Sequence, residues 1–316
     1  MQAYLIDSSI YIFRSYFTLP ENWQALDSGH STHAVYGFTA FLLDMLRNKN
    51  PEHLFCAFDE SLGSGFRHQL CSDYKANREL PDEALAFQLN ACRQLCRVLG
   101  IAEMASDTYE ADDLIGAVAK NARLANSQPV VVTRDKDLMQ LIEAEDLFWD
   151  FGKAPPKTQR QVEKDLEIGC QQMADFLALT GDSSDNIAGV PGVGAKTAKQ
   201  LLLHFPDIDA ILDHLDQLQD LPIRGASKLA DKIDNHRDQL LLARQLTTIC
   251  TDIAEAPKLE QIAWQGINLN AFDLFCEEMG FAGKFHDRAK QLRGRQLTPS
   301  WQSNLISALN SPQESF

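Results

Sequence analysis

The chain lacks several features that would place it in a common class of protein. Its 316 residues include seven cysteines, an odd number, and no two of them form a CxxC pair. Neither a disulfide framework nor a zinc site is therefore favoured. No apolar run approaches the roughly 18 residues of a membrane span, and the opening MQAYLIDSSIYIF lacks a basic start and a small-residue cleavage site. We expect a cytoplasmic protein without a membrane segment, whose cysteines are small buried apolar residues.

Positive charge is also scarce. The chain has 29 Lys and Arg against 44 Asp and Glu, which gives a formal net charge of −15. This balance argues at first against an anionic partner such as nucleic acid. The argument weakens if many of the acids lie together in one site, where bound cations would neutralise them. The net charge is therefore a poor guide to the partner.

Three short apolar runs each lead into aspartate, and we predict that they are strands buried on both faces of a mostly parallel sheet. The runs are AYLID, HLFCAFD and PVVVTRDKD, which lead to Asp7, Asp59, Asp135 and Asp137. Helical spacing recurs between them, at 34–49, 84–100 and 110–126, so the pattern predicts an α/β fold. Ligands of open α/β sheets bind at the carboxyl ends of the strands, which is where these aspartates are expected.

The stretch TYEADDLIGAVA places Glu110, Asp112 and Asp113 at the start of a predicted helix. Helix capping explains one such acid, just as a turn or an N-cap explains a single aspartate after a strand. Together with four aspartates at strand ends, however, three adjacent acids would repel one another unless divalent cations held them. The acids therefore predict a metal site.

After about residue 150 the pattern becomes mainly helical. We expect a loop and connector over 153–165, a first domain over 1–165, a helical domain over 166–295 and a loosely attached tail over 296–316. The helices are predicted at 170–180, 195–204, 207–215, 225–234, 236–249 and 271–279.

The window LALTGDSSDNIAGVPGVGAKTAKQLL, residues 177–202, superficially resembles a P-loop. Ala195 separates the second glycine from Lys196, and the preceding segment is helical, so a nucleoside triphosphatase is disfavoured. The alternative is two helices joined by a glycine-rich hairpin, in which Gly192 and Gly194 let the backbone approach a DNA phosphate. Asp182 and Asp185 nearby either cap a turn or face one metal ion together.

Basic residues near this window leave two interpretations open. Lys196 and Lys199 add charge to the second helix, and a further basic series follows at Arg224, Lys228 and Lys232. These residues form either a DNA-facing stripe or a solvated helix face. The same choice applies to KFHDRAKQLRGR at 284–295.

The segment 59–84 lies between the second strand and the next long helix, and it carries Arg67, Lys75 and Arg78. Its length and glycine content predict a mobile functional connection, a flexible arch at about 60–84, over the strand ends. Ordinary exposed surface charge is the alternative.

Three motifs together resemble the 5′-nuclease, or flap endonuclease, family, which includes the N-terminal 5′→3′ exonuclease domain of bacterial DNA polymerase I and stand-alone proteins. The motifs are EADDLIG, RDKDLMQL and DFLALTGDSSDNIAGVPGVGAKTA, and the resemblance covers about residues 1–290. It implies a PIN-like nuclease domain followed by a helix-hairpin-helix (helix-two-turns-helix) DNA-binding region. It also implies hydrolysis of DNA phosphodiester bonds at 5′ flaps or ends in replication and repair, with two Mg²⁺ or Mn²⁺ ions and one K⁺.

The resemblance further implies roles for individual residues. Lys75 and Arg78 match a catalytic basic pair above the site, while Tyr74 and Arg67 would contact DNA, Tyr74 by stacking on a base. The first metal would be held by Asp7, Asp59, Glu110 and Asp112, and the second by Asp113, Asp135, Asp137, Asp182 and Asp185, with Asp113 near both. The K⁺ ligands would be main-chain oxygens of Leu179, Thr180, Ala188, Val190 and Val193. The hairpin on the DNA phosphates would comprise Gly192, Val193, Gly194, Ala195, Lys196 and Thr197.

This sequence departs from the family pattern at Ser8 and Arg134, where glycine is common, and at Ala188, where proline is usual. Arg134 brings a positive charge beside the acids. A polymerase domain is also absent after residue 300, so we expect a stand-alone, monomeric nuclease that acts on branched or flapped DNA, with possible functional links to a DNA polymerase and a ligase. Two alternatives are a DNA-junction-binding protein that has lost catalysis and a PIN-type ribonuclease.

Overall fold

A six-stranded sheet forms the centre of the computed structural model, which describes residues 1–61, 63–223 and 225–292. The strands are β1 (Gln2–Asp7), β2 (His53–Asp59), β3 (Ala102–Ser106), β4 (Gln128–Val132), β5 (Leu147–Trp149) and β6 (Lys157–Thr158). Their order is β3-β2-β1-β4-β5-β6, and only the β5–β6 pairing is antiparallel among these strands. The expected mostly parallel sheet is confirmed. Ile6 of β1 pairs with both Cys56 and Val132, so the carboxyl ends of β1, β2 and β4 lie side by side.

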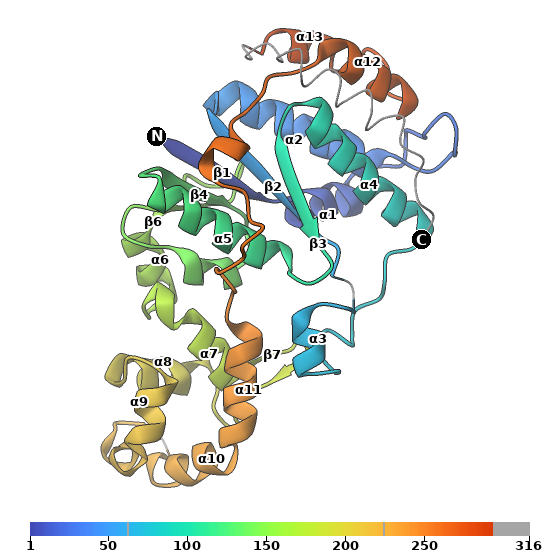
Figure 1. Cartoon of the computed structure of the whole chain (residues 1–316). Coiled ribbons are helices and arrows are strands. Elements are labelled where there is room, and N and C mark those ends of the chain that lie inside the picture. The colour runs from blue at the N-terminus through green and yellow to red at the C-terminus, as the bar shows by residue number, and fades with distance from the viewer. Residues whose placement is uncertain (62, 224, 293–316) are drawn as a thin grey trace.

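Helices cover both faces of the sheet (Figure 1). On one face, α1 (Ser8–Thr18), α2 (His33–Lys49) and α4 (Glu83–Val98) share a core with Tyr4 and Ile6 of β1. On the other face, α5 (Ala111–Leu124) and the 3-10 helix η1 (Asp137–Leu141) pack on Ala3 and Leu5. Successive side chains of a strand point to opposite faces, so a strand buried on both faces must be apolar throughout. This is why AYLI is a continuous apolar run.

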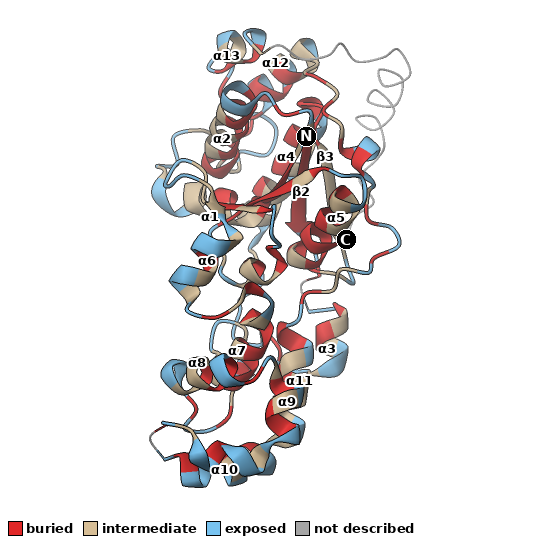
Figure 2. Ribbon diagram, turned by 90° about the vertical axis from the view of Figure 1, so that its left-hand side faces the viewer, coloured by how far each residue is buried: buried red, intermediate tan, exposed pale blue. Residues whose placement is uncertain are grey.

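A third core belongs to a helical unit below the sheet (Figures 1 and 2). Its elements are η2 (Cys170–Gln172), α7 (Met173–Thr180), β7 (Gly181–Asp182), β8 (Ile187–Ala188), α8 (Ala195–His204), α9 (Ile208–Asp213), η3 (Leu215–Asp220), η4 (Ala226–Lys228), α10 (Leu229–Asn235) and α11 (Arg237–Thr247). Local hydrogen bonds mark where helices of this unit begin. For example, the Asp207 carboxylate accepts a hydrogen bond from the Ala210 amide at 2.8 Å and begins α9. Among the described residues, no helix has the length and apolarity needed to cross a membrane.

The expected connector over 153–165 is partly regular structure. It contains β6 and most of α6 (Gln159–Leu166), and the Gln161 side chain accepts a hydrogen bond from the Thr158 amide at 2.9 Å where α6 begins. β3 and β5 were also not expected. β3 is a half-buried edge strand of sequence AEMAS, and β5 has three residues. Neither gives a long apolar run.

The segment after α11 corrects the expectation that 166–295 forms one helical domain. This segment contains η5 (Leu259–Ile262), α12 (Leu269–Glu278) and α13 (His286–Lys290). Ile249, Ile253 and Ile262 belong to one core of the sheet, and Phe272 and Phe281 belong to the other. The chain therefore returns from the helical unit to both faces of the sheet.

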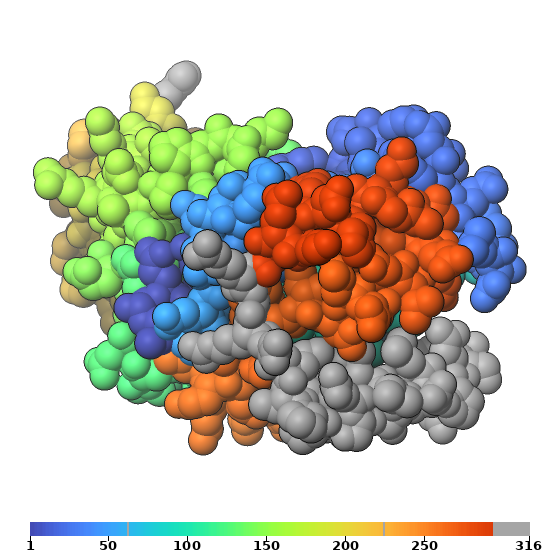
Figure 3. All heavy atoms as spheres, turned by 90° about the horizontal axis from the view of Figure 1, so that it is seen from above, coloured from blue at the N-terminus to red at the C-terminus, as the bar shows by residue number. Residues whose placement is uncertain are grey.

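The return ends beside α2, with α12 and α13 above that helix in Figure 1, and its orange and red atoms cover the middle of the face seen from above in Figure 3. Thr32 donates a hydrogen bond to the Met279 carbonyl at 2.7 Å, and Arg288 pairs with Asp44 at 2.9 Å. Arg288, from the basic stretch 284–295, thus already has an acidic partner in the fold. Residues 293–295 of that stretch, Arg224 and the expected tail over 296–316 lie outside the described residues.

Candidate metal centre

Acidic side chains gather at the carboxyl ends of β1, β2 and β4. Asp7 ends β1, Asp59 ends β2, and Asp135 follows β4. Thr133 donates a hydrogen bond to Asp7 at 2.8 Å and accepts one from the Asp135 amide at 2.9 Å, so it joins two of these strand ends. Asp59 accepts a hydrogen bond from the Ala111 amide at 2.8 Å, which places the start of α5 beside it.

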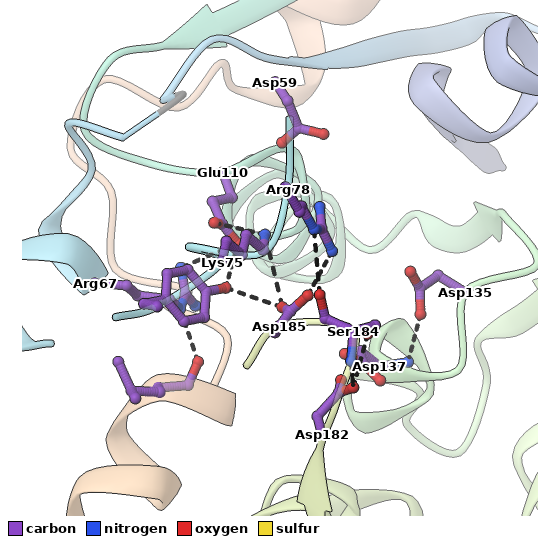
Figure 4. Close-up of polar contacts among 12 residues, drawn as sticks. Asp59, Arg67, Lys75, Arg78, Glu110, Asp135, Asp137, Asp182, Ser184 and Asp185 are labelled. Carbon is purple, nitrogen blue, oxygen red and sulfur yellow. Dashed lines mark hydrogen bonds and ion pairs between the residues drawn. The ribbon is translucent and has the colours of Figure 1, made fainter. Parts of the chain in front are cut away.

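A second acidic group comes from η1 and from the β7–β8 turn. Asp137, Asp182 and Asp185 each offer a carboxylate oxygen, and these three oxygens lie within 4.8 Å of one another (Figure 4). Asp182 also accepts hydrogen bonds from the amide and the hydroxyl of Ser184, at 2.8 and 2.7 Å. The helical unit thus supplies two carboxylates to the site at the sheet.

Both groups line one cavity of about 610 Å³, which we call the acid basin. Its lining also includes Phe13 and Phe17 of α1 and four cationic side chains. The acids of the basin are Asp7, Asp59, Glu110, Asp112, Asp135, Asp137, Asp182 and Asp185, and its cations are Arg14, Lys75, Arg78 and Arg134. The structure therefore brings together eight of the nine predicted metal ligands and both predicted catalytic cations.

Lys75 and Arg78 lie over the basin at the end of the arch. Lys75 donates to Glu110 at 2.7 Å and lies 3.7 Å from Asp185, while Arg78 forms an ion pair with Asp185 (Figure 4). Burial alone would lower the pKa of Lys75, but attraction by Glu110 and Asp185 outweighs it and raises the pKa. The ammonium therefore stays charged. The backbone of Lys75 is left-handed, with φ of 53°, and its amide donates to the Asp185 carbonyl at 2.9 Å.

The acids disturb one another's protonation. Burial, followed by repulsion from Asp59, raises the pKa of Asp7 to about 7. Burial, followed by repulsion from Asp135 and Asp182, raises the pKa of Asp137 to about 7. Burial and neighbouring acids also raise the pKa of Asp112 well above its ordinary value. Each shift shows that negative charge is unfavourable here without a compensating cation.

The donor set fits divalent cations. Mg²⁺ and Mn²⁺ prefer carboxylate and water oxygens, and the basin offers eight carboxylates in one cavity. Three of them already present oxygens close enough to share one ion. The neighbouring acids that raise these pKa values would be stabilised as carboxylates by such an ion.

Asp113 corrects the expectation of a ninth ligand. Its carboxylate is fully buried outside the lining of the basin, and both oxygens accept from Arg67, at 2.7 and 2.8 Å. The same carboxylate accepts from the amides of Glu110 at 3.0 Å and Cys250 at 2.8 Å. Four hydrogen bonds of this kind fully engage the carboxylate.

Arg67 and Tyr74 also differ from their expected DNA contacts, because both are buried, at 3% and 2% exposure. The Tyr74 hydroxyl can donate a hydrogen bond to the carboxylate of Glu110 or to that of Asp185, and its oxygen lies 3.1 Å from an oxygen of each. Its ring belongs to the core of the helical unit. The ring is therefore packed against protein and is not positioned to stack on a base.

The predicted potassium loop runs from the end of α7 to the hairpin. The Leu179 carbonyl accepts from the Val190 amide at 3.0 Å, and the Val190 carbonyl accepts from the Val193 amide at 2.9 Å. Gln239 of α11 donates to the carbonyls of Ala188 at 3.1 Å and Gly189 at 2.8 Å. These bonds hold the loop in one conformation. The carbonyl of Thr180, the remaining predicted ligand, lies at the C-terminal end of α7.

The predicted phosphate hairpin, Gly192 to Thr197, lies at the start of α8, with Gly194 as the N-cap residue. Gly192 has φ of 82°, and a Cβ at this position would lie 2.8 Å from the Lys232 ammonium. Glycine therefore serves both the turn and the approach of Lys232. Lys196 and Ala195 are exposed at the first turn of α8, while Lys199 pairs with Glu167 at 2.7 Å.

Two supporting residues, Thr133 and Gln239, were missed from the sequence. Thr133 is part of the quoted run PVVVTRDKD, and its place beside Asp135 was an available signal. Gln239 lies about fifty positions from its partners, and nothing local marks it. Of the departures, Ser8 is fully buried and its hydroxyl has no hydrogen-bond partner among the described residues, whereas Arg134 is exposed and lines the basin.

Two sequence families cover most of the chain. Residues 2–167 match the 5′-3′ exonuclease, N-terminal resolvase-like domain, and residues 168–270 match the 5′-3′ exonuclease, C-terminal SAM fold. The 5′-3′ exonuclease of Buchnera aphidicola subsp. Schizaphis graminum (strain Sg) is 33% identical over 250 residues, which are 79% of this chain and 86% of that protein. DNA polymerase I of Bacillus subtilis (strain 168) is 33% identical over 281 residues, which are 88% of this chain and 31% of the polymerase. The chain thus spans about a third of the length of the polymerases that it matches.

Solved structures agree on the fold. T5 5′-exonuclease with bound zinc has a TM-score of 0.65 at 16% identity, covering 97% of this chain and 99% of that chain. The catalytic core of Rad2 in complex with DNA substrate has a TM-score of 0.61 at 13% identity, covering 92% and 91%. The two family matches and the Buchnera relative establish that this chain belongs to the 5′-3′ exonuclease family.

Proposed function

We propose that the protein is a structure-specific 5′ nuclease that hydrolyses DNA phosphodiester bonds at 5′ flaps and 5′ ends during replication and repair. The observation that carries this proposal is the acid basin, in which eight carboxylates from both the sheet and the helical unit meet below Lys75 and Arg78. The Buchnera relative is a 5′-3′ exonuclease. Structures with the same fold have been solved with metal ions and DNA.

The basin would hold two divalent cations, Mg²⁺ or Mn²⁺. We assign Asp7, Asp59, Glu110 and Asp112 to one ion and Asp135, Asp137, Asp182 and Asp185 to the other. When bound, a pair of such ions activates water and stabilises the leaving oxygen of an in-line displacement. The grouping follows the elements, because the first four side chains come from β1, β2 and the start of α5, and three of the last four share the close cluster.

Lys75 and Arg78 would bind the phosphate that is cleaved. Each now pairs with a carboxylate of the basin. A phosphate entering the basin would bring negative charge to the same cations, and metal ions would compensate the carboxylates that lose these partners. Charge stabilisation of this kind is a major contribution to phosphoryl transfer.

DNA binding would fall mainly to the helical unit. The hairpin from Gly192 to Thr197 presents amides at the start of α8, and Lys196 and Lys232 lie beside it. Helix starts of this type bind phosphate without reading sequence. A K⁺ ion held by the predicted main-chain oxygens would add positive charge next to the same phosphates, and K⁺ replaced by Na⁺ should then weaken DNA binding.

Cleavage assays test the whole proposal. Purified protein is incubated with a 5′-flap duplex, a blunt duplex and single-stranded RNA, each with Mg²⁺ or with EDTA. Cleavage of the flap duplex only with Mg²⁺ supports the nuclease. Flap binding without metal-dependent cleavage would favour a junction-binding protein, and preferred cleavage of single-stranded RNA would favour a PIN-type ribonuclease. Links to a DNA polymerase and a ligase, and action as a monomer, remain part of the proposal.

A further inference from the structure

A buried ion pair lies directly behind the acid basin. Arg67 donates to both carboxylate oxygens of Asp113, at 2.7 and 2.8 Å, and the two side chains are 4% and 0% exposed. Burial opposes the charge on Arg67, but the hydrogen bond and charge of Asp113 outweigh it and raise the arginine pKa. A bidentate ion pair of this kind fixes the orientation of both side chains in addition to pairing their charges.

The pair joins three segments that are distant in the sequence. Arg67 belongs to α3 (Phe66–Leu70) in the arch, and Asp113 belongs to the first turn of α5. Arg67 also donates to the carbonyls of Leu246 at 2.8 Å and Thr248 at 2.9 Å, where α11 ends. Asp113 completes the connection by accepting from the Cys250 amide at 2.8 Å.

The start of α5 depends on this pair. Asp113 accepts from the Glu110 amide at 3.0 Å, which fixes the residue before the first helical turn. The same short turn carries Glu110 and Asp112, whose side chains line the basin. Arg67 also lies 3.7 Å from the Glu110 carboxylate. A shift of Asp113 would therefore move two side chains of the basin together.

We infer that Arg67 and Asp113 are positioning residues, which hold the start of α5 so that Glu110 and Asp112 present their carboxylates to a divalent cation. This inference rests on the proposed metal chemistry of the basin. It assigns the pair a role through other residues and not as metal ligands or DNA contacts. Partners that orient metal ligands typically change metal affinity by about 10- to 100-fold when they are removed.

The location of Arg67 adds a consequence for the arch. The arch also contacts the β7–β8 turn, where Asn77 donates to the Ser183 carbonyl at 3.0 Å and Asn186 donates to the Asp73 carbonyl at 2.7 Å. The contacts of Arg67 would thus both dock the arch and hold the start of α5, which carries two of the proposed metal ligands. Since linkage is reciprocal, a bound ion should stabilise the docked arch to the same degree that docking favours the ion.

The test compares two Arg→Lys variants at opposite ends of α5, Arg67 of α3 beside its start and Arg123 in its last turn. Arg67→Lys keeps the charge but cannot serve both oxygens of Asp113 and two carbonyls at once. Arg123→Lys is the matched control. Arg123 lies at the other end of α5, contacts the largely buried Asp146 through Nε at 3.0 and 3.3 Å, and donates to the Leu141 carbonyl, away from the basin.

Two readouts use the full chain without DNA. Calorimetric titration with Mn²⁺ should give a dissociation constant at least about tenfold weaker for Arg67→Lys than for the unsubstituted protein, with little change for Arg123→Lys. Amide hydrogen exchange should become faster at residues 111–114 in Arg67→Lys but not in Arg123→Lys. If Arg67→Lys does not fold, Asp113→Asn takes its place in both measurements.

The outcomes distinguish the positioning role of Arg67 and Asp113 from the proposed metal binding of the basin. Equal Mn²⁺ affinity in Arg67→Lys and the unsubstituted protein, or an equal loss in both variants, would overturn the positioning role. An unsubstituted protein that binds no Mn²⁺ would instead overturn the proposed metal chemistry. In that case hydrogen exchange still decides whether Arg67 holds the start of α5, since unchanged exchange at 111–114 would show that it does not.

Discussion

Thr133 donates a hydrogen bond from Oγ1 to Oδ2 of Asp7 at 2.8 Å, and the two residues stand at the ends of neighbouring parallel strands. This contact lowers the pKa of Asp7, against burial and the repulsion from Asp59 that raise it to about 7. Thr133 thus favours the charged form of one carboxylate in the acid basin. Its hydroxyl also orients Asp135 through the backbone amide.

Replacing Thr133 by valine should weaken divalent metal binding. The variant removes the hydroxyl donor to Asp7 at nearly constant side-chain shape, so the pKa of Asp7 should rise and Mn²⁺ affinity should fall, most clearly below pH 7. Calorimetric titration at two pH values measures the effect. Thr39→Val is the control, because Thr39 is also fully buried and donates to the Val35 carbonyl, but in α2. An equal loss of affinity in both variants would contradict the prediction.

Asp112→Ala should abolish cleavage while leaving DNA binding nearly intact. The side chain lines the basin, and we expect a rate loss greater than about 100-fold, beyond the loss typical of residues behind the ligands. Single-turnover cleavage of a 5′-flap duplex and a binding titration in Ca²⁺ measure the two properties. Asp135→Ala should behave in the same way. Loss of binding that parallels the loss of cleavage would count against separate catalytic and binding regions.

Lys196→Ala should weaken DNA binding with little effect on the cleavage rate at saturating DNA. Lys196 is exposed at the start of α8 and is not part of the basin lining. Loss of one phosphate contact should reduce the slope of log binding constant against log salt by about 0.9 for a duplex. Lys199→Ala provides the comparison, because Lys199 is already paired with Glu167. A slope that is unchanged in Lys196→Ala would remove this residue from the interface.

The metal-free protein should lose stability as pH rises from about 4 to about 8. Asp7 and Asp137 have pKa values raised to about 7 in the fold, so the folded state binds more protons than the unfolded state in this range. The contribution of these two groups to stability is therefore fully present below the ordinary aspartate pKa and is lost as pH rises through about 7. Thermal unfolding in EDTA measures this trend, and Mg²⁺ should stabilise the protein more at pH 8 than at pH 5.

Asp137→Asn separates this effect from general acid sensitivity. The variant cannot acquire the unfavourable charge, so its metal-free melting temperature should fall less between pH 5 and pH 8 than that of the unsubstituted protein. Asp216 lies in η3, outside the basin lining, so Asp216→Asn should leave the melting temperature unchanged at both pH 5 and pH 8. A steeper fall in Asp137→Asn would show that the sign of the effect is wrong.

The strands and helices that carry the acids were predictable because their signals are local. An apolar run such as AYLI, followed by aspartate, predicts both a buried strand and the position of Asp7 at its end. Glu110 and Asp112 follow from the start of a helix with clear apolar spacing. The structure confirms these elements and places their side chains in one cavity.

The role of Asp113 was not predictable in this way. Motif and spacing treat it as one more acid beside Asp112, but consecutive helical residues point about 100° apart. Its partner Arg67 lies 46 positions earlier and Cys250 lies 137 positions later. Contacts of this range depend on how α3, α5 and the end of α11 come together, which no local pattern records.

The return of the chain to the sheet makes the helical unit an insertion and not an appendage. Its entry near α6 and its exit after α11 both join segments that pack into the same core of the sheet, through Val162 and Ile249. A fragment cut after residue 167 would lose Ile262, Phe272 and Phe281 from those cores and expose the apolar surfaces that they cover. We therefore expect that a fragment ending at residue 167 would be less stable than the full chain, because both cores of the sheet would be incomplete.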